Sequence, residues 1–473
     1  MKNKGYWALT IVVLGLLIFA CKSPEKKDNS LSEKLDAYLK AEATYHRFNG
    51  NVLIAENGKI LFQKSYGLSN FDSHQLLNDS TVFELASVSK QFTATAILML
   101  KDEGKLSLSD SLRNFFPELP YQGITIYQML THTSGLPDYE EAMSIKWDHK
   151  KIAFNNDIIS FFAKEKPAAL FKPGAKWLYS NTAYAILASI VEKVSGEPFP
   201  TFLSKRIFTP LSMSRTRIYN TRRSLKDTIP NYAYGFLYND STKKYQMPDS
   251  MPGMDFVYYL DGIFGDGVVN STTADLLKWD RSVKTHRLLS ETSQAEMLKG
   301  QALMDTANNW YYGFGVGIQK TDSGDIIAHS GGWPGYVTYL ARNVVKDQTY
   351  IVLSNNASNS PAISNALMDI VNGKEIVLAY EHKAIELDSN ALKVFVGKYQ
   401  GKQRFQIEQK AGKLFFVSAN GEKQEIKPES NTRFFFAKQP YMLLDFELDT
   451  QKKLKKVTLI NHGKKSDVKF SDE

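Results

Sequence analysis

The sequence predicts an α+β protein, in which an antiparallel sheet is flanked by helices and carries a helical subdomain, with a separate small β domain at the C-terminal end. Three observations support this fold class. A helix-like segment and a hairpin open the chain, a long run of helical patterns separates them from strand patterns at 311–353, and short alternating strands follow residue 391. The 473 residues, 43% of them apolar, suffice to bury a large core.

The first elements are a helix and a hairpin. Leucine and tyrosine recur at helical spacing over Leu31–His46, which predicts the opening helix. Residues 51–55 and 60–62 are expected to be two strands joined at Asn57-Gly58, because Asn-Gly favours tight hairpin turns. Residues 87–100 (SVSKQFTATAILML) are apolar on nearly every side, which is the pattern of a helix buried inside a domain.

The middle of the chain carries further helices and the remaining strands of the sheet. Several of these helices begin with Ser or Thr, residues that cap helix N-termini. The expected helices are 125–130, 182–194, 199–207, 273–279 and 362–371, and the expected strands are 311–319, 326–329, 336–342 and 349–353.

The pattern changes after the larger domain, which we assign to residues 31–373. Residues 374–390 have mixed composition and are expected to be a linker to a small β domain at 391–473. Seventeen Lys and Arg against ten Asp and Glu give this last part most of the formal net charge of +8. A solvated, lysine-rich surface is the favoured interpretation, and attraction to an anionic lipid or cell-wall polymer is the alternative. Its strands are expected at 405–408, 413–417, 434–437, 442–448 and 457–460.

Residues 1–21 are interpreted as an export signal. A basic start precedes the apolar run Tyr6–Ala20, which is short for a membrane span, although a single anchoring helix is the alternative. Ile18-Phe19-Ala20-Cys21 resembles the lipobox of bacterial lipoproteins, whose cysteine becomes lipidated. Cys21 is the only cysteine, so neither a disulfide nor cysteine-based catalysis is expected. We therefore expect an exported protein, periplasmic or facing the cell surface, that is lipid-anchored to a bacterial membrane through the flexible tether 22–30.

A Ser-x-x-Lys pair supplies the candidate nucleophile. Only Ser87 and Lys90 stand at the start of a buried apolar helix, one turn apart, so that their side chains share a face. A helix N-terminus favours developing negative charge, and burial lowers the cost of a neutral lysine. A helix cap with a surface lysine is the alternative. The chain holds four such pairs: Ser23/Lys26, Ser87/Lys90, Ser241/Lys244 and Ser466/Lys469.

Two more segments carry candidate site residues. Tyr179-Ser180-Asn181 is the only Tyr-x-Asn among 24 tyrosines, and a phenol held near ammonium groups can act as a base. A capping Asn beside a packed Tyr is the alternative. His329-Ser330-Gly331 ends an expected strand and is followed by Gly332, and small residues here would let backbone amides approach a ligand closely.

Other chemistries find little support. No His or carboxylate lies at metal-ligand spacing around His329, so neither a metal nor a cofactor is expected. The usual serine-hydrolase motif, Gly-x-Ser-x-Gly, is absent from the sequence. Nothing resembles a nucleic-acid-binding module, so no nucleic-acid partner is expected.

Taken in order, these segments resemble the serine beta-lactamase and penicillin-binding protein superfamily, and within it the class C beta-lactamase and DD-peptidase group. The resemblance spans about residues 51–373 and includes 130–136 (LTHTSGL) and 266–272 (DGVVNST). It implies a beta-lactamase/transpeptidase-like fold. It implies that Ser87 is the acylated nucleophile and Lys90 its proton partner. Tyr179 would act as base and then as acid, Asn181 would orient the reacting groups through its amide, and His329 would replace the motif lysine. The N–H groups of Ser87 and Gly332 would form the oxyanion hole, and Ser330 and Gly331 would bind substrate.

The histidine decides between branches of the group. Class C beta-lactamases carry lysine where this chain has His329, whereas DD-carboxypeptidases, D-aminopeptidases and related esterases often carry histidine, and Ser180 points the same way. We therefore expect a hydrolase of D-amino-acid peptides or esters, with a small peptide or ester, such as a cell-wall peptide, as substrate. A beta-lactamase and a non-catalytic penicillin-binding or cell-wall-binding sensor lipoprotein are the alternatives. The C-terminal strands resemble the small lipocalin-like barrel appended to such hydrolases.

Overall fold

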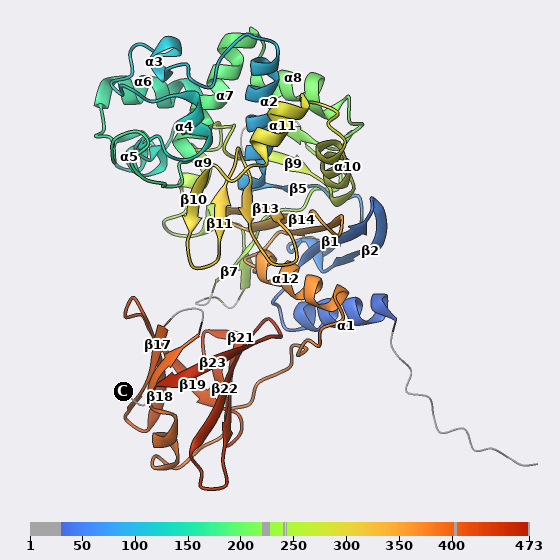
Figure 1. The fold of residues 1–473 in the computed structure, drawn as a ribbon, viewed down its shortest axis with the longest axis vertical. Helices are drawn as coiled ribbons and strands as arrows, with labels where there is room; N and C mark the ends of the chain where they lie inside the picture. The colour runs from blue at the N-terminus through green and yellow to red at the C-terminus, as the bar shows by residue number, and fades with distance from the viewer. Residues whose placement is uncertain (1–29, 220–227, 240–241, 243, 402–403, 472–473) are drawn as a thin grey trace, which may run out of the picture.

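A computed structural model describes residues 30–219, 228–239, 242, 244–401 and 404–471. They form a larger domain of helices packed on an antiparallel sheet, and a small β domain next to it (Figure 1). The predicted α+β fold class is confirmed. The predicted export signal, with Cys21, lies outside the described residues. Within the described part, no helix is long and apolar enough to cross a membrane.

The central sheet has eight antiparallel strands in the order β10-β11-β12-β13-β14-β15-β1-β2. Its hairpin turn between β1 and β2 is the one expected, since Asn57 and Gly58 both have positive φ, at 50° and 76°. The first strand of the sheet along the chain, β1, pairs over its whole length with the last, β15. The strands are β1 (Gly50–Glu56), β2 (Lys59–Tyr66), β10 (Ala302–Asp305), β11 (Trp310–Tyr312), β12 (Gly317–Gln319), β13 (Ile326–Trp333), β14 (Tyr336–Asn343) and β15 (Gln348–Ser354).

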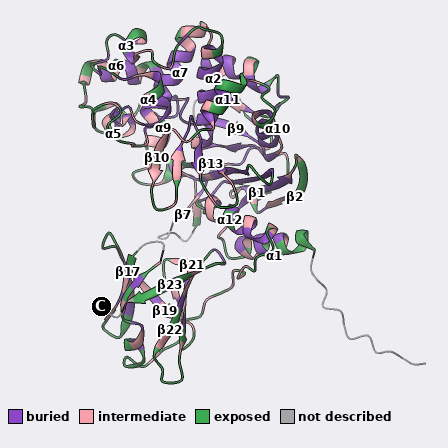
Figure 2. Ribbon diagram, in the orientation of Figure 1, coloured by how far each residue is buried: buried purple, intermediate pink, exposed green. Residues whose placement is uncertain are grey.

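Helices cover both faces of this sheet. Along β1, Val52 and Ile54 pack with α1 (Leu31–Thr44) and α12 (Ser360–Val371), while the alternate residues face α2 (Lys90–Asp102) and α10 (Thr273–Lys284) on the other side. Figure 2 shows the buried residues concentrated in these layers and in the helices above them. The sheet is therefore the middle layer of the larger domain.

The remaining helices form the predicted helical subdomain on the α2 side of the sheet (Figure 1). The helices are α3 (Leu112–Phe115), α4 (Ile126–Leu130), α5 (Tyr139–Lys146), α6 (Asn155–Glu165), α7 (Asn181–Ser195), α8 (Phe199–Leu203), α9 (Phe256–Tyr259) and α11 (Glu291–Met297). The short helical turns are η1 (Ala86–Ser89), η2 (Ser204–Phe208), η3 (Pro248–Ser250) and η4 (Ala391–Phe395). The short strands are β3 (Leu68–Asn70), β4 (Gln75–Leu76), β5 (Phe83–Glu84), β6 (Arg217–Ile218), β7 (Leu237–Asn239), β8 (Lys244–Gln246) and β9 (Val269–Ser271).

One expected strand, 311–319, is two. The chain turns between β11 and β12, and Gly315 at this turn has φ of 72°. A Cβ on Gly315 would stand 2.6 Å from the carbonyl oxygen of Lys90, so the turn packs directly on the first residue of α2. The turn that separates β11 from β12 therefore packs against the start of α2, where the candidate Lys90 lies.

The C-terminal domain is a closed eight-stranded barrel in sequential order. Aromatic side chains fill its interior, among them Phe395, Phe434 and Phe446, whose rings contact one another. The barrel is therefore a packed core rather than an open container. Its strands are β16 (Gly397–Gln400), β17 (Arg404–Lys410), β18 (Lys413–Ser418), β19 (Lys423–Pro428), β20 (Arg433–Phe436), β21 (Gln439–Leu448), β22 (Leu454–Asn461) and β23 (Lys464–Ser471).

The barrel docks against α1, which lies between α12 and the barrel in Figure 1. His462, in the turn between β22 and β23, has its Nδ1 atom 3.0 Å from Glu42 Oε2. The Tyr38 hydroxyl donates a hydrogen bond of 3.3 Å to the His462 carbonyl oxygen. All three side chains are buried, so the contact is a polar cluster inside the interface.

Candidate active site

Ser87 and Lys90 meet at the junction of η1 and α2. The Lys90 Nζ atom lies 3.1 Å from Ser87 Oγ, across one helical turn. Residues 86 and 88–90 are buried whereas Ser87 is partly exposed, so the hydroxyl is presented at the surface of a buried segment. The predicted helix thus begins with one tight 3-10 turn that carries the serine.

The Lys90 side chain is enclosed by acceptors. Besides Ser87 Oγ, its Nζ atom donates to Asn181 Oδ1 and to the carbonyl oxygen of Asp266, each at 2.8 Å. Three acceptors match the three N–H bonds of an ammonium group, and the side chain is 0% exposed. Lys90 Nζ in this arrangement holds the serine oxygen and the amide of Asn181 in place.

The backbone before the nucleophile is strained and held from two sides. Ala86 has φ of 47°, a conformation rarely adopted by residues other than glycine. The Thr338 hydroxyl donates to the Leu85 carbonyl oxygen at 2.7 Å, and a Cβ on Gly331 would stand 2.1 Å from the same oxygen. Gly331 therefore lets β13 approach the segment that carries Ser87.

Tyr179 and Asn181 come to the same place from the start of α7. The Ser180 side chain caps this helix by accepting from the Ala183 N–H at 3.1 Å, which leaves Asn181 in the first turn. The Tyr179 ring centre lies 4.9 Å from Lys90 Nζ, so the ammonium faces the ring. The structure therefore brings Ser87, Lys90, Tyr179 and Asn181 together.

A buried histidine, His132, packs against the ring of Tyr179. Its ring centre is 4.2 Å from that of Tyr179, and its Nδ1 atom accepts the Ser180 N–H at 3.0 Å. Burial, followed by the charge of Lys90, lowers the pKa of His132 well below its usual value. A neutral ring therefore supports Tyr179 without adding a second positive charge.

His329, which the resemblance places where relatives carry the motif lysine, lies in the same cluster, with its ring centre 6.3 Å from that of Tyr179. Its Nδ1 atom is 2.6 Å from the Ser330 carbonyl oxygen, so Nδ1 carries the proton and Nε2 accepts from the Tyr312 hydroxyl at 3.0 Å. Burial, and then the charge of Lys90, lowers the pKa of His329 to about 3. His329 is neutral, and both its nitrogens already have partners.

Residues on β13 divide between its two faces. His329 and Gly331 are buried, while Ser330 and Gly332 are exposed on the opposite face. A Cβ on Gly332 would meet no atom within 4 Å, and Gly332 lines a cavity together with Ser87. Ser330 and Gly332 are therefore the β13 residues on the substrate side, and Gly331 packs inward.

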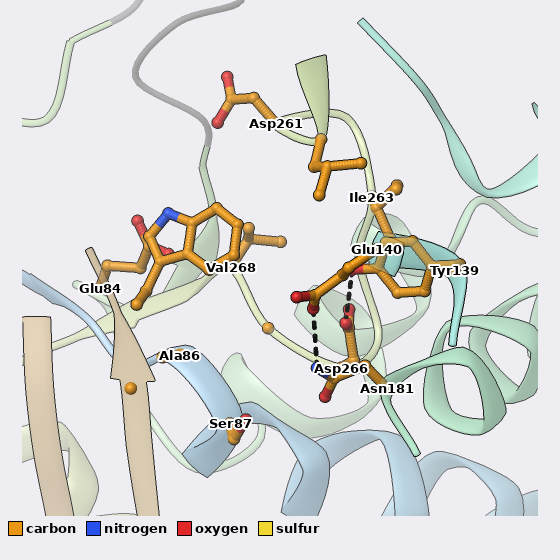
Figure 3. Close-up of a pocket in the computed structure, with 14 residues that line it drawn as sticks. Glu84, Ala86, Ser87, Tyr139, Glu140, Asn181, Asp261, Ile263, Asp266 and Val268 are labelled. Atoms are coloured by element: carbon orange, nitrogen blue, oxygen red, sulfur yellow. Dashed lines mark hydrogen bonds between the residues drawn. The ribbon is translucent and has the colours of Figure 1, made fainter. Parts of the chain in front are cut away.

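A cavity of about 120 Å³ opens beside Ser87. Ile263, Val268 and Trp333 provide apolar wall, and four carboxylate residues line it: Glu84, Glu140, Asp261 and Asp266. Figure 3 shows Ser87 at one end, with Glu140 and Asp266 side by side next to Asn181. Of the described residues that line the cavity, none is Lys, Arg or His.

Two of these carboxyl groups belong to the hydrogen-bond network of the site. Asn181 Nδ2 donates to Glu140 Oε1 at 2.8 Å, and the Tyr139 hydroxyl donates to Asp266 Oδ2 at 2.9 Å. Burial, together with the negative charges of Asp266 and Asp138, raises the pKa of Glu140 to about 7. Burial also raises the pKa of Asp266.

Sequence reasoning did not single out Tyr139, Glu140 or Tyr312, and it included His132 only as part of the segment 130–136, without a role in the site. Asp138 caps α5 by accepting from the N–H groups of Glu140 and Glu141, and an Asp followed by acidic residues is a recognisable helix start. That signal locates the helix but does not say that Glu140 faces a cavity.

Comparisons with known proteins identify the family of the chain. A protein-family model described as Beta-lactamase matches residues 33–372. Penicillin-binding protein 4* of Bacillus subtilis is 38% identical over 399 residues, which are 82% of this chain and 88% of that protein.

Solved structures resemble the chain as well. A penicillin binding protein from Bacillus halodurans has a TM-score of 0.62 at 25% identity and covers 73% of this chain and 99% of its own. D-amino acid amidase from Ochrobactrum anthropi SV3, with a TM-score of 0.61 at 20% identity and the same coverage, shares the fold. The chain belongs to the beta-lactamase family and is a serine hydrolase of the beta-lactamase and penicillin-binding type.

Proposed function

We propose that the protein hydrolyses amide or ester bonds of small D-amino-acid substrates through an acyl-enzyme on Ser87. The observation that carries this proposal is the contact of Lys90 Nζ with both Ser87 Oγ and Asn181 Oδ1, at 3.1 and 2.8 Å, at the end of an open cavity. Serine hydroxyls are weak nucleophiles unless a neighbouring group orients them and takes their proton.

The proposed reaction has two halves. Ser87 Oγ attacks the substrate carbonyl carbon while its proton passes to the phenolate oxygen of Tyr179, which becomes a neutral phenol; Lys90 Nζ, beside the ring, stabilises the phenolate before the transfer. The N–H groups of Ser87 and Gly332 receive the negative oxygen of the tetrahedral intermediate. Tyr179 then returns the proton to the leaving amine or alcohol. A water molecule repeats the attack on the ester, which releases the acid and restores the Ser87 hydroxyl.

The state of His329 bears on which substrates fit. A C-terminal carboxylate needs a cation or free hydrogen-bond donors, and the neutral His329 has both nitrogens engaged, with Ser330 and Tyr312. This favours an amidase, aminopeptidase or esterase over a DD-carboxypeptidase or a beta-lactamase. A D-amino acid amidase of the same fold supports that order by analogy.

Active-site labelling tests the proposal. The wild-type protein is incubated with a fluorophosphonate or a fluorescent penicillin, and peptide mass spectrometry is expected to find a single adduct on Ser87. The matched variant Ser87→Ala is expected to take no label. Label on another residue, or none with either probe, contradicts the proposal. Nitrocefin turnover in the same preparation measures beta-lactamase activity directly.

We also propose that the protein is exported and lipid-anchored through Cys21, from the apolar run and lipobox-like ending of residues 1–21. Metabolic labelling with an alkyne fatty acid is expected to mark the wild-type protein. The variant Cys21→Ala is expected to lose that label, and equal labelling of both proteins contradicts the proposal.

A further inference from the structure

Val268, in the wall of the cavity beside Ser87, has an unusual backbone conformation. Its φ is 61°, and among the described residues other than glycine that have positive φ it is the only one with a β-branched side chain. A β-branched residue in this region is a backbone outlier, and such outliers persist where the surrounding structure holds them, often at active sites. The conformation of Val268 therefore points to a role in the cavity that it lines.

Hydrogen bonds on both sides of its peptide unit hold Val268 in place. Its carbonyl oxygen accepts from Asn270 Nδ2 at 3.0 Å, and the Val269 N–H donates to Ser89 Oγ at 3.1 Å. The Val269 carbonyl oxygen accepts from the Leu85 N–H at 2.8 Å. The segment is thus tied to residues on both sides of the nucleophile, and a β-branched side chain has little rotational freedom of its own. The isopropyl group is therefore a fixed part of the wall.

The rest of the apolar wall is packed as well. Ile263 is 3% exposed and belongs to the main core of the domain. The Trp333 ring packs edge-on against Phe256 of α9, with 5.6 Å between the ring centres and 88° between their planes. Val268 and Ile263 lie above Ser87 in the view of Figure 3. A large substrate group would have to displace packed side chains to enter this space.

The size of the cavity limits what it can hold. An engineered apolar cavity of about 150 Å³ binds a benzene ring. The cavity beside Ser87 has about 120 Å³ and must admit the reacting carbonyl group as well. It therefore suits a methyl-sized side chain and is too small for an aromatic one.

The proposed reaction places the acyl part of the substrate in this cavity. The N–H groups of Ser87 and Gly332 would hold the reacting carbonyl group, and both residues line the cavity. Tyr179 would return the proton to the leaving group, and it is not among the described residues of the lining. The leaving group therefore departs on the side of Tyr179, and the acyl group stays beside Val268.

We propose that Val268 is a specificity-determining residue that limits the acyl part of the substrate to small groups. The substrate class is then amides and esters whose acyl group carries a methyl-sized side chain, such as alanyl derivatives. This inference rests on the proposed function, because it assigns the acyl side of the reaction at Ser87.

The test compares two neutral esters that differ only in the size of the acyl group. p-Nitrophenyl acetate and p-nitrophenyl phenylacetate share the leaving group, and the second carries a phenyl ring on the acyl methyl carbon. We would measure kcat/KM for both esters with the wild type, Val268→Gly, Val268→Ala and Val268→Thr. Glycine and alanine open the wall, and glycine also suits positive φ, whereas threonine keeps the branched shape. The ratio between the esters cancels any general loss of activity.

Lys166 offers a control for the backbone. It follows the last residue of α6, is exposed, and has φ of 50°. Lys166→Gly relieves the same kind of backbone strain at a residue that does not line the cavity.

The wild type is expected to prefer the acetate. In Val268→Gly the ratio of kcat/KM for acetate over phenylacetate is expected to fall about 10- to 100-fold, the range over which apolar pockets discriminate by size. Val268→Ala is expected to shift the ratio in the same direction by less, and Val268→Thr and Lys166→Gly to keep the wild-type ratio. Equal hydrolysis of both esters by the wild type, or an unchanged ratio in both Val268→Gly and Val268→Ala, overturns the inference. An equal fall in Lys166→Gly would assign the effect to the backbone and overturn it too.

The variant Ser87→Ala separates this inference from the proposed function. If the wild type hydrolyses p-nitrophenyl acetate and Ser87→Ala does not, the nucleophile is established whatever the size preference. A ratio that does not respond to Val268 then removes the role of Val268 alone. Failure of both esters in the wild type overturns both proposals.

Discussion

The Tyr312 hydroxyl donates a hydrogen bond of 3.0 Å to His329 Nε2, while Nδ1 of the same ring donates to the Ser330 carbonyl oxygen. With these two contacts His329 is a neutral ring at the position where the resemblance places the motif lysine. His329 therefore adds no positive charge to the site.

The depressed pKa of His329 predicts a pH dependence of stability. Its pKa in the folded state is about 3 against 6.5 for the ordinary side chain, so the unfolded state binds the extra proton as the pH falls below 6.5. Stability is therefore lost on the acid side. Relative to wild type, His329→Gln is expected to gain about 2 kcal/mol of unfolding free energy between pH 8 and pH 5.

Urea denaturation at the two pH values measures this change. The same substitution at exposed His286 serves as the control. If His329→Gln and wild type lose equal stability on acidification, the buried imidazole is not the neutral group described above.

Glu140 predicts the opposite dependence. Its pKa is raised from 4.5 to about 7, so the folded state holds a proton that the unfolded state releases as the pH rises through that range. Wild type therefore loses stability between pH 4.5 and 7. Glu140→Gln is expected to recover about 2–3 kcal/mol relative to wild type at pH 8, and almost nothing at pH 4.

Chemical denaturation of Glu140→Gln, Glu141→Gln and wild type at pH 4 and pH 8 tests this. Because Glu141 is exposed on the same helix turn, its variant controls for the change of net charge. A gain in Glu141→Gln that matches the gain in Glu140→Gln would assign the effect to net charge.

The candidate nucleophile, lysine, tyrosine and amide could be read from the sequence because each stands at the start of an apolar helix, where local pattern fixes position. The charge of His329 could not be read, since it depends on burial and on Tyr312, a residue from another strand. Glu140 was missed for the same reason: its helix is polar on most sides, and only the tertiary structure turns one of two adjacent acids into the cavity.

The barrel contains strands that the sequence pattern does not predict. The five strands expected from their apolar alternation are present, but β16, β19 and β23 were not expected. In β19, Ile426 is the only buried residue among polar neighbours, because the outer surface of a small barrel is solvated and its interior is narrow. Because Ile426 is the one buried residue of the six and the residues that share its face are Gln424 and Pro428, the apolar period is too weak to detect.

The two neighbouring glycines of β13 make a matched pair for a test of packing. A Cβ at position 331 would overlap the Leu85 carbonyl oxygen at 2.1 Å and Thr338 Oγ1 at 2.3 Å, whereas a Cβ at 332 has open space. Gly331→Ala is therefore expected to cost about 2–3 kcal/mol of unfolding free energy, and Gly332→Ala less than about 1 kcal/mol. Thermal and urea denaturation compare them, and equal costs would show that β13 does not press on the segment before Ser87.

The interface between the barrel and α1 predicts a coupling between two buried residues. Glu42 and His462 are 0% and 1% exposed, with 3.0 Å between Oε2 and Nδ1. Removing one partner leaves the other buried and unpaired, so Glu42→Ala and His462→Ala are each expected to cost about 3 kcal/mol.

Because the second substitution removes a group that the first has already left without its partner, the double variant is expected to cost less than the sum of the single variants. Urea denaturation gives the three free energies, and limited proteolysis of the segment 374–390 reports whether the barrel has separated from α1. Strict additivity with unchanged proteolysis would mean that this polar cluster does not hold the two domains together. A coupling of about 1 kcal/mol or more, with faster cleavage in the single variants, would make it the contact that fixes the barrel to the hydrolase domain.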